Sequence, residues 1–164
     1  MSMKQELIDG IKDELVRTRR VLAAFPASAH EMRPHPTSQT TRELAHTLCV
    51  EAVIGAKAVD GSLDLSKMGG FPKAPATWGE VMTAFDGAYD GLLKALEATN
   101  DADLLTTTTW LTGPKQMGPV PKVGIVKFML NDHIHHRGQL SVYLRMSGSK
   151  VPSIYGPSKD EPWM

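Results

Sequence analysis

The sequence predicts an all-α protein: a four-helix bundle with long connections and an irregular C-terminal tail. Two observations support this prediction. Apolar residues recur at three- and four-residue steps in four separate stretches, which is the period of a helix with one buried face. Prolines and glycines gather between these stretches, where they interrupt helices. Four long helices in 164 residues make one domain, residues 1–164, with room for a core.

We place the four helices at 3–25, 41–59, 78–98 and 122–147. Two of them begin with the pattern of a capping box, in which a threonine is followed three residues later by a glutamate. The pairs are Thr40 with Glu43 and Thr77 with Glu80. Gly148 follows the fourth helix, and a glycine commonly ends a helix at this position.

Two segments are not expected to be helical. The threonine run 106–109 favours a short extended piece, but the glycines and prolines that follow argue against a long strand. The tail 151–164 carries three prolines, which exclude a fifth long helix.

The overall composition excludes several classes of protein. Eighteen basic and eighteen acidic residues cancel, which argues against nucleic acid as a partner. A single cysteine, Cys49, cannot form an internal disulfide and fits a reducing compartment. The first 25 residues carry charges throughout, and no run of 18 apolar residues occurs, so neither a signal peptide nor a membrane span is expected. We therefore expect a soluble cytoplasmic protein.

The most informative stretch is 131–139, which holds three of the six histidines together with a carboxylate, an arginine and a glutamine. At 100° per residue, His136 lies at the centre of the apolar face of its helix. Asp132 lies one turn earlier on the same side, and His133 lies on the other flank of that face. A buried imidazole beside a buried carboxylate is costly unless both are paired or bind a cation.

A second candidate, His46, lies within the second helix, with apolar residues on or near its side (Val50, Val53 and Ile54). A single histidine in such a place is more often a hydrogen-bonded core residue than a metal ligand. The opposite side of this helix is also apolar, which leaves surface for a second copy of the chain. We therefore expect a homodimer.

The string IHHRGQLSVYLR at 134–145, followed by VPSIYGPS at 151–158, resembles the C-terminal signature of the DinB family. The segments RPHP at 33–36 and RELAH at 42–46 resemble the N-terminal part of the same family. The resemblance implies a four-helix bundle that holds a divalent metal ion. One ligand would be a histidine on the second helix, and two others would lie four residues apart on the last long helix. In this sequence these positions are His46, Asp132 and His136.

Asp132 departs from the family pattern, since many members carry a histidine there. The thiol-dependent maleylpyruvate isomerases, which share the fold, are similar to this chain in using a carboxylate. Two histidines and one carboxylate suit Zn²⁺, Ni²⁺, Fe²⁺ or Mn²⁺ and leave positions open for water or substrate. His133 is an alternative to Asp132, because His133 and His136 could also converge. A hydrogen bond between Asp132 and His136 without any metal is a further alternative.

The resemblance and the candidate site favour a metal-dependent enzyme of thiol-transferase type. The ion would hold a low-molecular-weight thiol as thiolate, which attacks a small electrophilic substrate. A metal-dependent hydrolase is the close alternative, and a non-catalytic metal-binding or stress-response protein is another. Arg137 and Gln139 flank the site, where they either orient a substrate or a metal ligand, or only form hydrogen bonds between helices or lie on a solvated edge.

Overall fold

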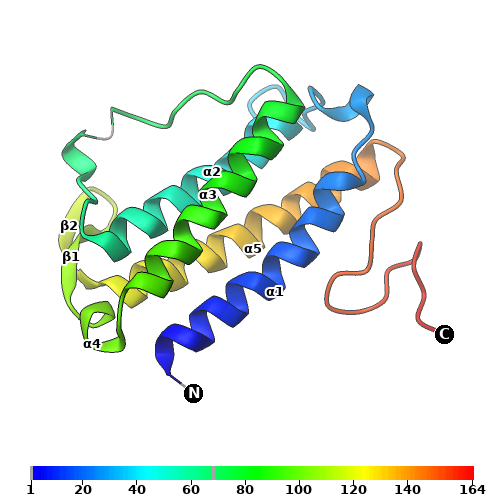
Figure 1. Ribbon diagram of the computed structural model, residues 1–164. Coiled ribbons are helices and arrows are strands. Elements are labelled where there is room, and N and C mark those ends of the chain that lie inside the picture. The colour runs from blue at the N-terminus through cyan, green and yellow to red at the C-terminus, as the bar shows by residue number, and fades with distance from the viewer. Residues whose placement is uncertain (1, 68) are drawn as a thin grey trace.

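The structure is a computed structural model that describes residues 2–67 and 69–164. Four long helices pack side by side, and a small β-hairpin lies at one end of them (Figure 1). The long helices are α1 (Met3–Ala23), α2 (Thr41–Asp60), α3 (Trp78–Ala98) and α5 (Lys122–Met146). The short elements are η1 (Ala27–Ala29), η2 (Leu65–Lys67), α4 (Asp101–Leu104), β1 (Thr107–Gly113) and β2 (Gln116–Pro121). The predicted helical bundle is confirmed, with a hairpin added to it.

The order of the helices explains the long connections. The connection 61–77 runs back along the bundle, so α2 and α3 point the same way, while α1 and α5 point the opposite way (Figure 1). Helix α2 packs mainly against α3 and α5. Glu51, near the middle of α2, contacts His136, near the middle of α5, and the candidate site lies between these two helices.

Both predicted capping boxes are present. The Thr40 hydroxyl accepts a hydrogen bond from the Glu43 backbone N–H at 3.2 Å, and the Glu43 carboxylate accepts one from the Thr40 N–H at 2.7 Å. Thr77 and Glu80 do the same at the start of α3. Each cap contributes about 1 kcal/mol by satisfying backbone donors that have no partner within the helix. Because these caps are local, the starts of α2 and α3 follow directly from the sequence.

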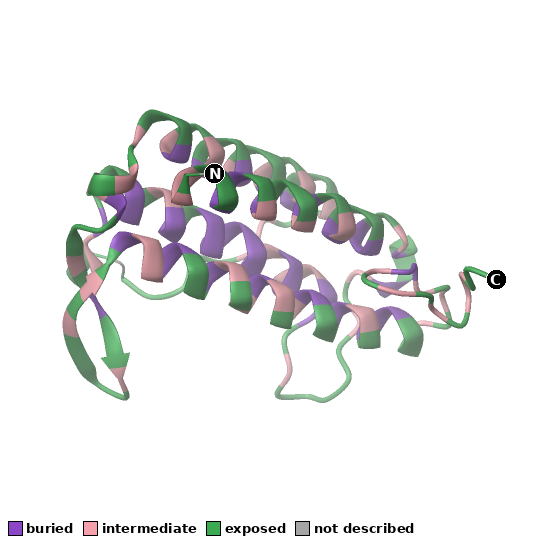
Figure 2. Ribbon diagram, turned by 90° about the horizontal axis from the view of Figure 1, so that it is seen from below, coloured by how far each residue is buried: buried purple, intermediate pink, exposed green. Residues whose placement is uncertain are grey.

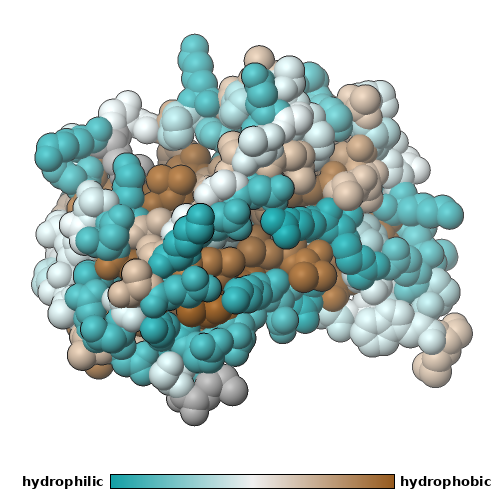
Figure 3. Space-filling model, viewed as in Figure 1, coloured by the Kyte–Doolittle hydropathy of each residue, from teal (hydrophilic) through white to brown (hydrophobic). Residues whose placement is uncertain are grey.

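The core consists of two clusters of buried apolar side chains. The larger lies between the four long helices and includes Phe85, Leu22 and Leu140, and buried residues line the inner faces of the helices (Figure 2). The outer face in Figure 3 is mainly hydrophilic, with hydrophobic side chains visible between the hydrophilic ones. The smaller cluster joins α2, α5 and the hairpin through residues such as Ile54 and Trp110. In the described part of the chain, no helix is both long and apolar enough to cross a membrane.

The hairpin is the main departure from the expected fold. Strands β1 and β2 pair antiparallel and extend well beyond the threonine run 106–109. In a two-stranded sheet each strand has one side without a partner strand. Pro119 and Pro121, which have no backbone N–H to donate, are therefore tolerated in β2. The Trp110 side chain is 6% exposed and fixes the hairpin to the smaller apolar cluster. The tail 151–164 has no helix, as predicted.

Candidate metal centre

Three side chains from α2 and α5 offer donor atoms that all lie within 4.8 Å of one another: Glu51, Asp132 and His136. His136 Nδ1 donates a hydrogen bond to Glu51 Oε1 at 2.5 Å and lies 3.8 Å from Asp132 Oδ1. The helix itself sets the pair on α5, because residues four apart lie on one face. Glu51 reaches that pair because α2 packs against α5, and its contact with His136 lies near the middle of both helices.

The donors differ in how far they are withdrawn from water. The Glu51 side chain is 4% exposed, that of His136 is 18% exposed and that of Asp132 is 37% exposed. Glu51 Oε2 is buried and has no hydrogen-bond partner in the described chain. A buried carboxylate oxygen without a partner is costly, and a cation would satisfy it. His136 Nδ1 lies 2.5 Å from the Glu51 oxygen and 3.8 Å from the Asp132 oxygen. Two donor atoms bound to one ion are expected to lie roughly 3 Å apart, which is between these two distances.

Burial changes the acidity of this group. Loss of hydration raises the pKa of Glu51 to about 7, although the hydrogen bond from His136 acts in the opposite direction, and the nearby Asp132 carboxylate adds to the increase. The hydrogen bond to Glu51 raises the pKa of His136. Without a cation, a proton lies in the hydrogen bond between His136 Nδ1 and Glu51 Oε1, and the two groups titrate as a coupled pair. A metal ion has to displace that proton in order to bind.

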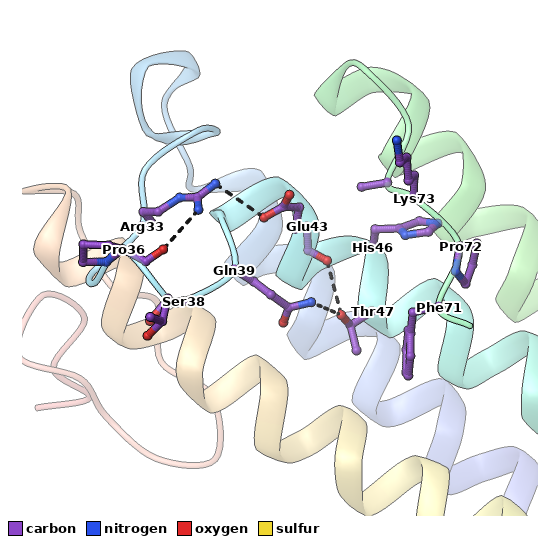
Figure 4. A pocket seen from close by; sticks show the side chains of 12 residues that line it. Arg33, Pro36, Ser38, Gln39, Glu43, His46, Thr47, Phe71, Pro72 and Lys73 are labelled. Atoms are coloured by element: carbon purple, nitrogen blue, oxygen red, sulfur yellow. Dashed lines mark hydrogen bonds and ion pairs between the residues drawn. The ribbon is translucent and has the colours of Figure 1, made fainter. Parts of the chain in front are cut away.

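His46 is not brought to this group. His46 precedes Glu51 by five positions, which places the two side chains about 140° apart around α2. His46 lies beside Pro72 and Lys73 of the connection 61–77, in a neighbouring cavity of about 300 Å³ whose lining does not include Glu51, Asp132 or His136 (Figure 4). Partial burial lowers the pKa of His46. The α2 donor that faces Asp132 and His136 is thus Glu51, and metal binding by His46 stays a prediction without support from this geometry.

His133, the alternative to Asp132, points to another part of the bundle. Its Nε2 atom hydrogen-bonds to the Thr18 hydroxyl at 2.6 Å, and its Nδ1 atom hydrogen-bonds to the Tyr89 hydroxyl. Burial lowers the pKa of His133 to about 3, so the ring is neutral at physiological pH. Both ring nitrogens are already engaged, whereas Asp132 lies beside His136.

Arg137 and Gln139 also lie away from the three donors. Arg137 is buried, forms an ion pair with Glu14 and donates to the Tyr155 hydroxyl at 2.6 Å. Gln139 hydrogen-bonds to His135 at 3.0 Å on the exposed side of α5. Arg137 therefore joins parts of the protein, and Gln139 lies on a solvated edge of α5; neither contacts the three donors in a way that would orient a substrate.

Sequence reasoning missed Glu51, although a signal was present. Glu51 is the only charged residue between Glu43 and Lys57 on α2, and the residues three positions away on either side, Leu48 and Ile54, are apolar. A carboxylate at the centre of an apolar helical face is either paired or a ligand. This argument is the same as the one that singled out His136.

A cavity of about 750 Å³ opens onto the three donors. It is bounded by α2, α5, the hairpin and the connection 61–77. Thr47, one turn before Glu51 on α2, also lines it, and the Thr47 hydroxyl accepts a hydrogen bond from the Gln39 amide at 3.1 Å (Figure 4). The candidate centre is therefore accessible to a small molecule.

Comparison with known proteins matches residues 1–163 to the DinB family. A DinB-like protein of Bacillus cereus is similar in structure, with a TM-score of 0.74 and 20% identity over 92% of this chain and 97% of that one. The DinB-like protein YjoA of Bacillus subtilis has a TM-score of 0.70 and 16% identity over 91% and 97% of the two chains. At such identities these structures support the fold alone.

In sequence, the chain is 43% identical over 42 residues to YrdA, an uncharacterized protein of Bacillus subtilis. The match spans 26% of this chain and 25% of YrdA. It therefore covers only about a quarter of either protein and carries no activity from one to the other.

Proposed function

The chain belongs to the DinB family, and we propose that it binds one divalent metal ion through Glu51, Asp132 and His136 and catalyses the reaction of a thiol with a small electrophile. The observation that supports metal binding most strongly is the Glu51 carboxylate. It is almost fully buried, lies among two further donor groups, and has one oxygen with no partner in the described chain. The candidate ions are zinc, nickel, iron and manganese.

Three protein ligands leave coordination positions open, which is the arrangement of catalytic rather than structural metal sites. The cavity beside the donors leads to these positions. When bound, a divalent ion supplies the Lewis acidity that favours the deprotonated form of a thiol or of water. The two carboxylates, Glu51 and Asp132, balance the charge of the ion, and His136 completes the set as a neutral donor.

The open cavity favours catalysis over a purely structural metal site, but it does not distinguish a thiol from water as the nucleophile. A metal-dependent hydrolase remains the close alternative, because the same opening admits water. A test that separates these alternatives uses protein purified without a histidine tag. Metal-free and metal-loaded samples are compared for consumption of a thiol with an electrophile, and for ester hydrolysis without thiol.

We expect thiol consumption that requires the metal ion and falls at least roughly tenfold in the Asp132→Asn variant. Ester hydrolysis without any thiol reaction would support the hydrolase instead. A metal-loaded protein that turns over neither substrate would contradict catalysis and favour a non-catalytic metal-binding protein.

The homodimer stays a prediction. Its sequence basis is a second apolar side on α2, and in the structure part of that side packs against the hairpin, as Ile54 does with Trp110. Val53 on α2 remains exposed. Light scattering at high micromolar concentration that gives twice the chain mass of 17.9 kDa would support the dimer, and the mass of a single chain would contradict it.

A further inference from the structure

We propose that the small electrophile of this site is a neutral, largely apolar molecule that carries an aromatic ring, bound in the cavity beside Glu51, Asp132 and His136. Phosphates, sulfates and carboxylates would be excluded. The inference rests on the proposed function in one respect, since it takes the cavity to be the entry to the metal centre.

The walls of the cavity are mainly apolar and come from three separate parts of the chain. The hairpin contributes Trp110, Leu111 and Met117, helix α5 contributes Phe128, and the connection 61–77 contributes Phe71. Four of these five side chains are exposed, the exception being Trp110. Exposed apolar side chains scattered singly need no explanation, but several that surround one opening indicate a binding site.

The aromatic side chains favour a flat ring as the ligand. The rings of Trp110 and Phe128 meet edge to face with centroids 6.4 Å apart, so the pair forms one corner of the cavity. Trp110 is held by the smaller apolar cluster, whereas Phe128 is half exposed at the opening. A ring bound beside this pair could contact Trp110 or Phe128 in the same edge-to-face or offset-stacked way, which stabilises pairs of aromatic rings. The volume of about 750 Å³ lies in the range of roughly 300–1,000 Å³ that holds drug-sized molecules.

The charges around the cavity argue against an anionic ligand. Among the described residues that line it there is no lysine or arginine, and the charged ones are Glu51 and Asp132. Two carboxylates and one divalent ion sum to zero formal charge. Away from the open positions of the ion, which the proposed function gives to the thiolate, an anionic group would lose its hydration without gaining a cationic partner from the protein, which is costly. The neighbouring cavity at His46 is lined by Arg33 and Lys73, so the absence of basic residues distinguishes the larger cavity.

Two fluorescent probes with the same ring system test this inference. N-phenyl-1-naphthylamine is neutral, and 1-anilinonaphthalene-8-sulfonate carries a sulfonate on the same rings. Each is titrated into metal-free and zinc-loaded protein, and binding is followed by probe fluorescence. We expect the neutral probe to bind at least about tenfold more tightly than the sulfonate, a difference of about 1.4 kcal/mol.

Two variants of α5 locate the probe. Phe128 and Val142 are exposed to a similar extent, but only Phe128 lines the cavity. Phe128→Asp should weaken binding of the neutral probe at least about tenfold by placing a charge at the opening, and Val142→Asp should leave it unchanged. Circular dichroism checks that both variants retain their helix content.

Tighter binding of the sulfonate, or equal loss in the two variants, would overturn the inference. So would a wild-type dimer that binds no probe and dissociates in Phe128→Asp, because the opening would then be an interface between two copies. Zinc uptake is measured on the same samples. Selective binding of the neutral probe to protein that takes up no zinc would support the assignment of the cavity and contradict the metal centre. Zinc uptake without binding of either probe would support the metal centre and contradict the assignment of the cavity.

Discussion

The two flanks of the inward face of α5 hold their histidines in different ways, His133 on one side of that face and His136 on the other. On one side, both ring nitrogens of His133 are hydrogen-bonded, one to Thr18 and the other to Tyr89, and the ring is buried. On the other side, His136 contacts Glu51, whose second oxygen has no partner in the described chain, and a cavity opens beside them. Polar groups that the protein satisfies by itself hold the structure together. Polar groups that lack a hydrogen-bond partner beside a cavity are places where an added ion or molecule can bind.

The satisfied side of α5 also fixes the C-terminal tail. Tyr155 donates a hydrogen bond to Glu14 at 2.8 Å and accepts one from Arg137, and the Arg137 guanidinium lies 5.0 Å from the centre of the Tyr155 ring. Arg137 also pairs with Glu14 on α1. One buried arginine thus joins α5, α1 and the tail, which is a structural role.

The largest expected change in stability comes from removing that arginine. Arg137→Met keeps the aliphatic stem but leaves Glu14 and Tyr155 without their cationic partner, and we expect a loss of roughly 3 kcal/mol in the free energy of unfolding. Urea denaturation at fixed pH measures this loss, and zinc stoichiometry of the folded variant should be unchanged. A loss below about 0.5 kcal/mol, the usual effect of a surface substitution, would show that the two sides of α5 do not differ as described.

A smaller change in the free energy of unfolding, of opposite sign, is expected on the side of α5 that carries His136 and faces Glu51. The pKa of Glu51 is raised from 4.5 to about 7 in the folded protein, so this group stabilises the fold at low pH and loses that contribution as the pH rises through about 7. Glu51→Gln removes the buried charge and keeps an acceptor for His136. We expect the metal-free variant to be about 1 kcal/mol more stable than metal-free wild type at pH 8, and the difference to vanish below pH 4.5.

Thermal and urea unfolding of metal-free protein between pH 4 and pH 8 give this comparison. A variant that is less stable than wild type at pH 8 would mean that the Glu51 carboxylate stabilises the empty site. In that case the site would be complete without a cation.

The smallest effect is expected for His46. It lies in the neighbouring cavity beside Pro72 and Lys73 and is not among the three grouped donors. His46→Ala should change zinc affinity less than about twofold, which is under 0.5 kcal/mol. Isothermal titration calorimetry measures it, with Asp132→Ala as the matched variant that should lose binding. Loss of zinc in His46→Ala would restore the ligand set implied by the family resemblance.

The sequence is sufficient to predict what depends on neighbours along the chain. The helices follow from apolar periodicity, their starts from the Thr–Glu pairs, and the closeness of Asp132 to His136 from their spacing on one helix. The hairpin was underestimated because TTTTW does not alternate polar and apolar residues and because two prolines lie in β2.

Glu51 could not be paired with Asp132 and His136 from the sequence, because contact between helices depends on their direction and rotation. The connection 61–77 is long enough to allow either direction of α3 relative to α2 and any rotation of the helices. Only the structure shows that α2 and α3 are parallel. The choice of His46 rests on the family resemblance, which implies a histidine ligand on the second helix, but helical periodicity places His46 about 140° from Glu51 around α2. The assignment of a donor on α2 therefore required the packing of the whole bundle.

Equilibrium dialysis against zinc at pH 7.5 tests the central claim most directly, using protein without a histidine tag. The samples are wild type, Glu51→Gln and His133→Gln, each shown to be folded by circular dichroism. We predict one ion per wild-type chain, affinity at least roughly 100-fold lower in Glu51→Gln, and affinity within a few-fold of wild type in His133→Gln. Absence of zinc uptake by the wild type, or undiminished uptake by Glu51→Gln, would contradict a metal centre built on Glu51, Asp132 and His136.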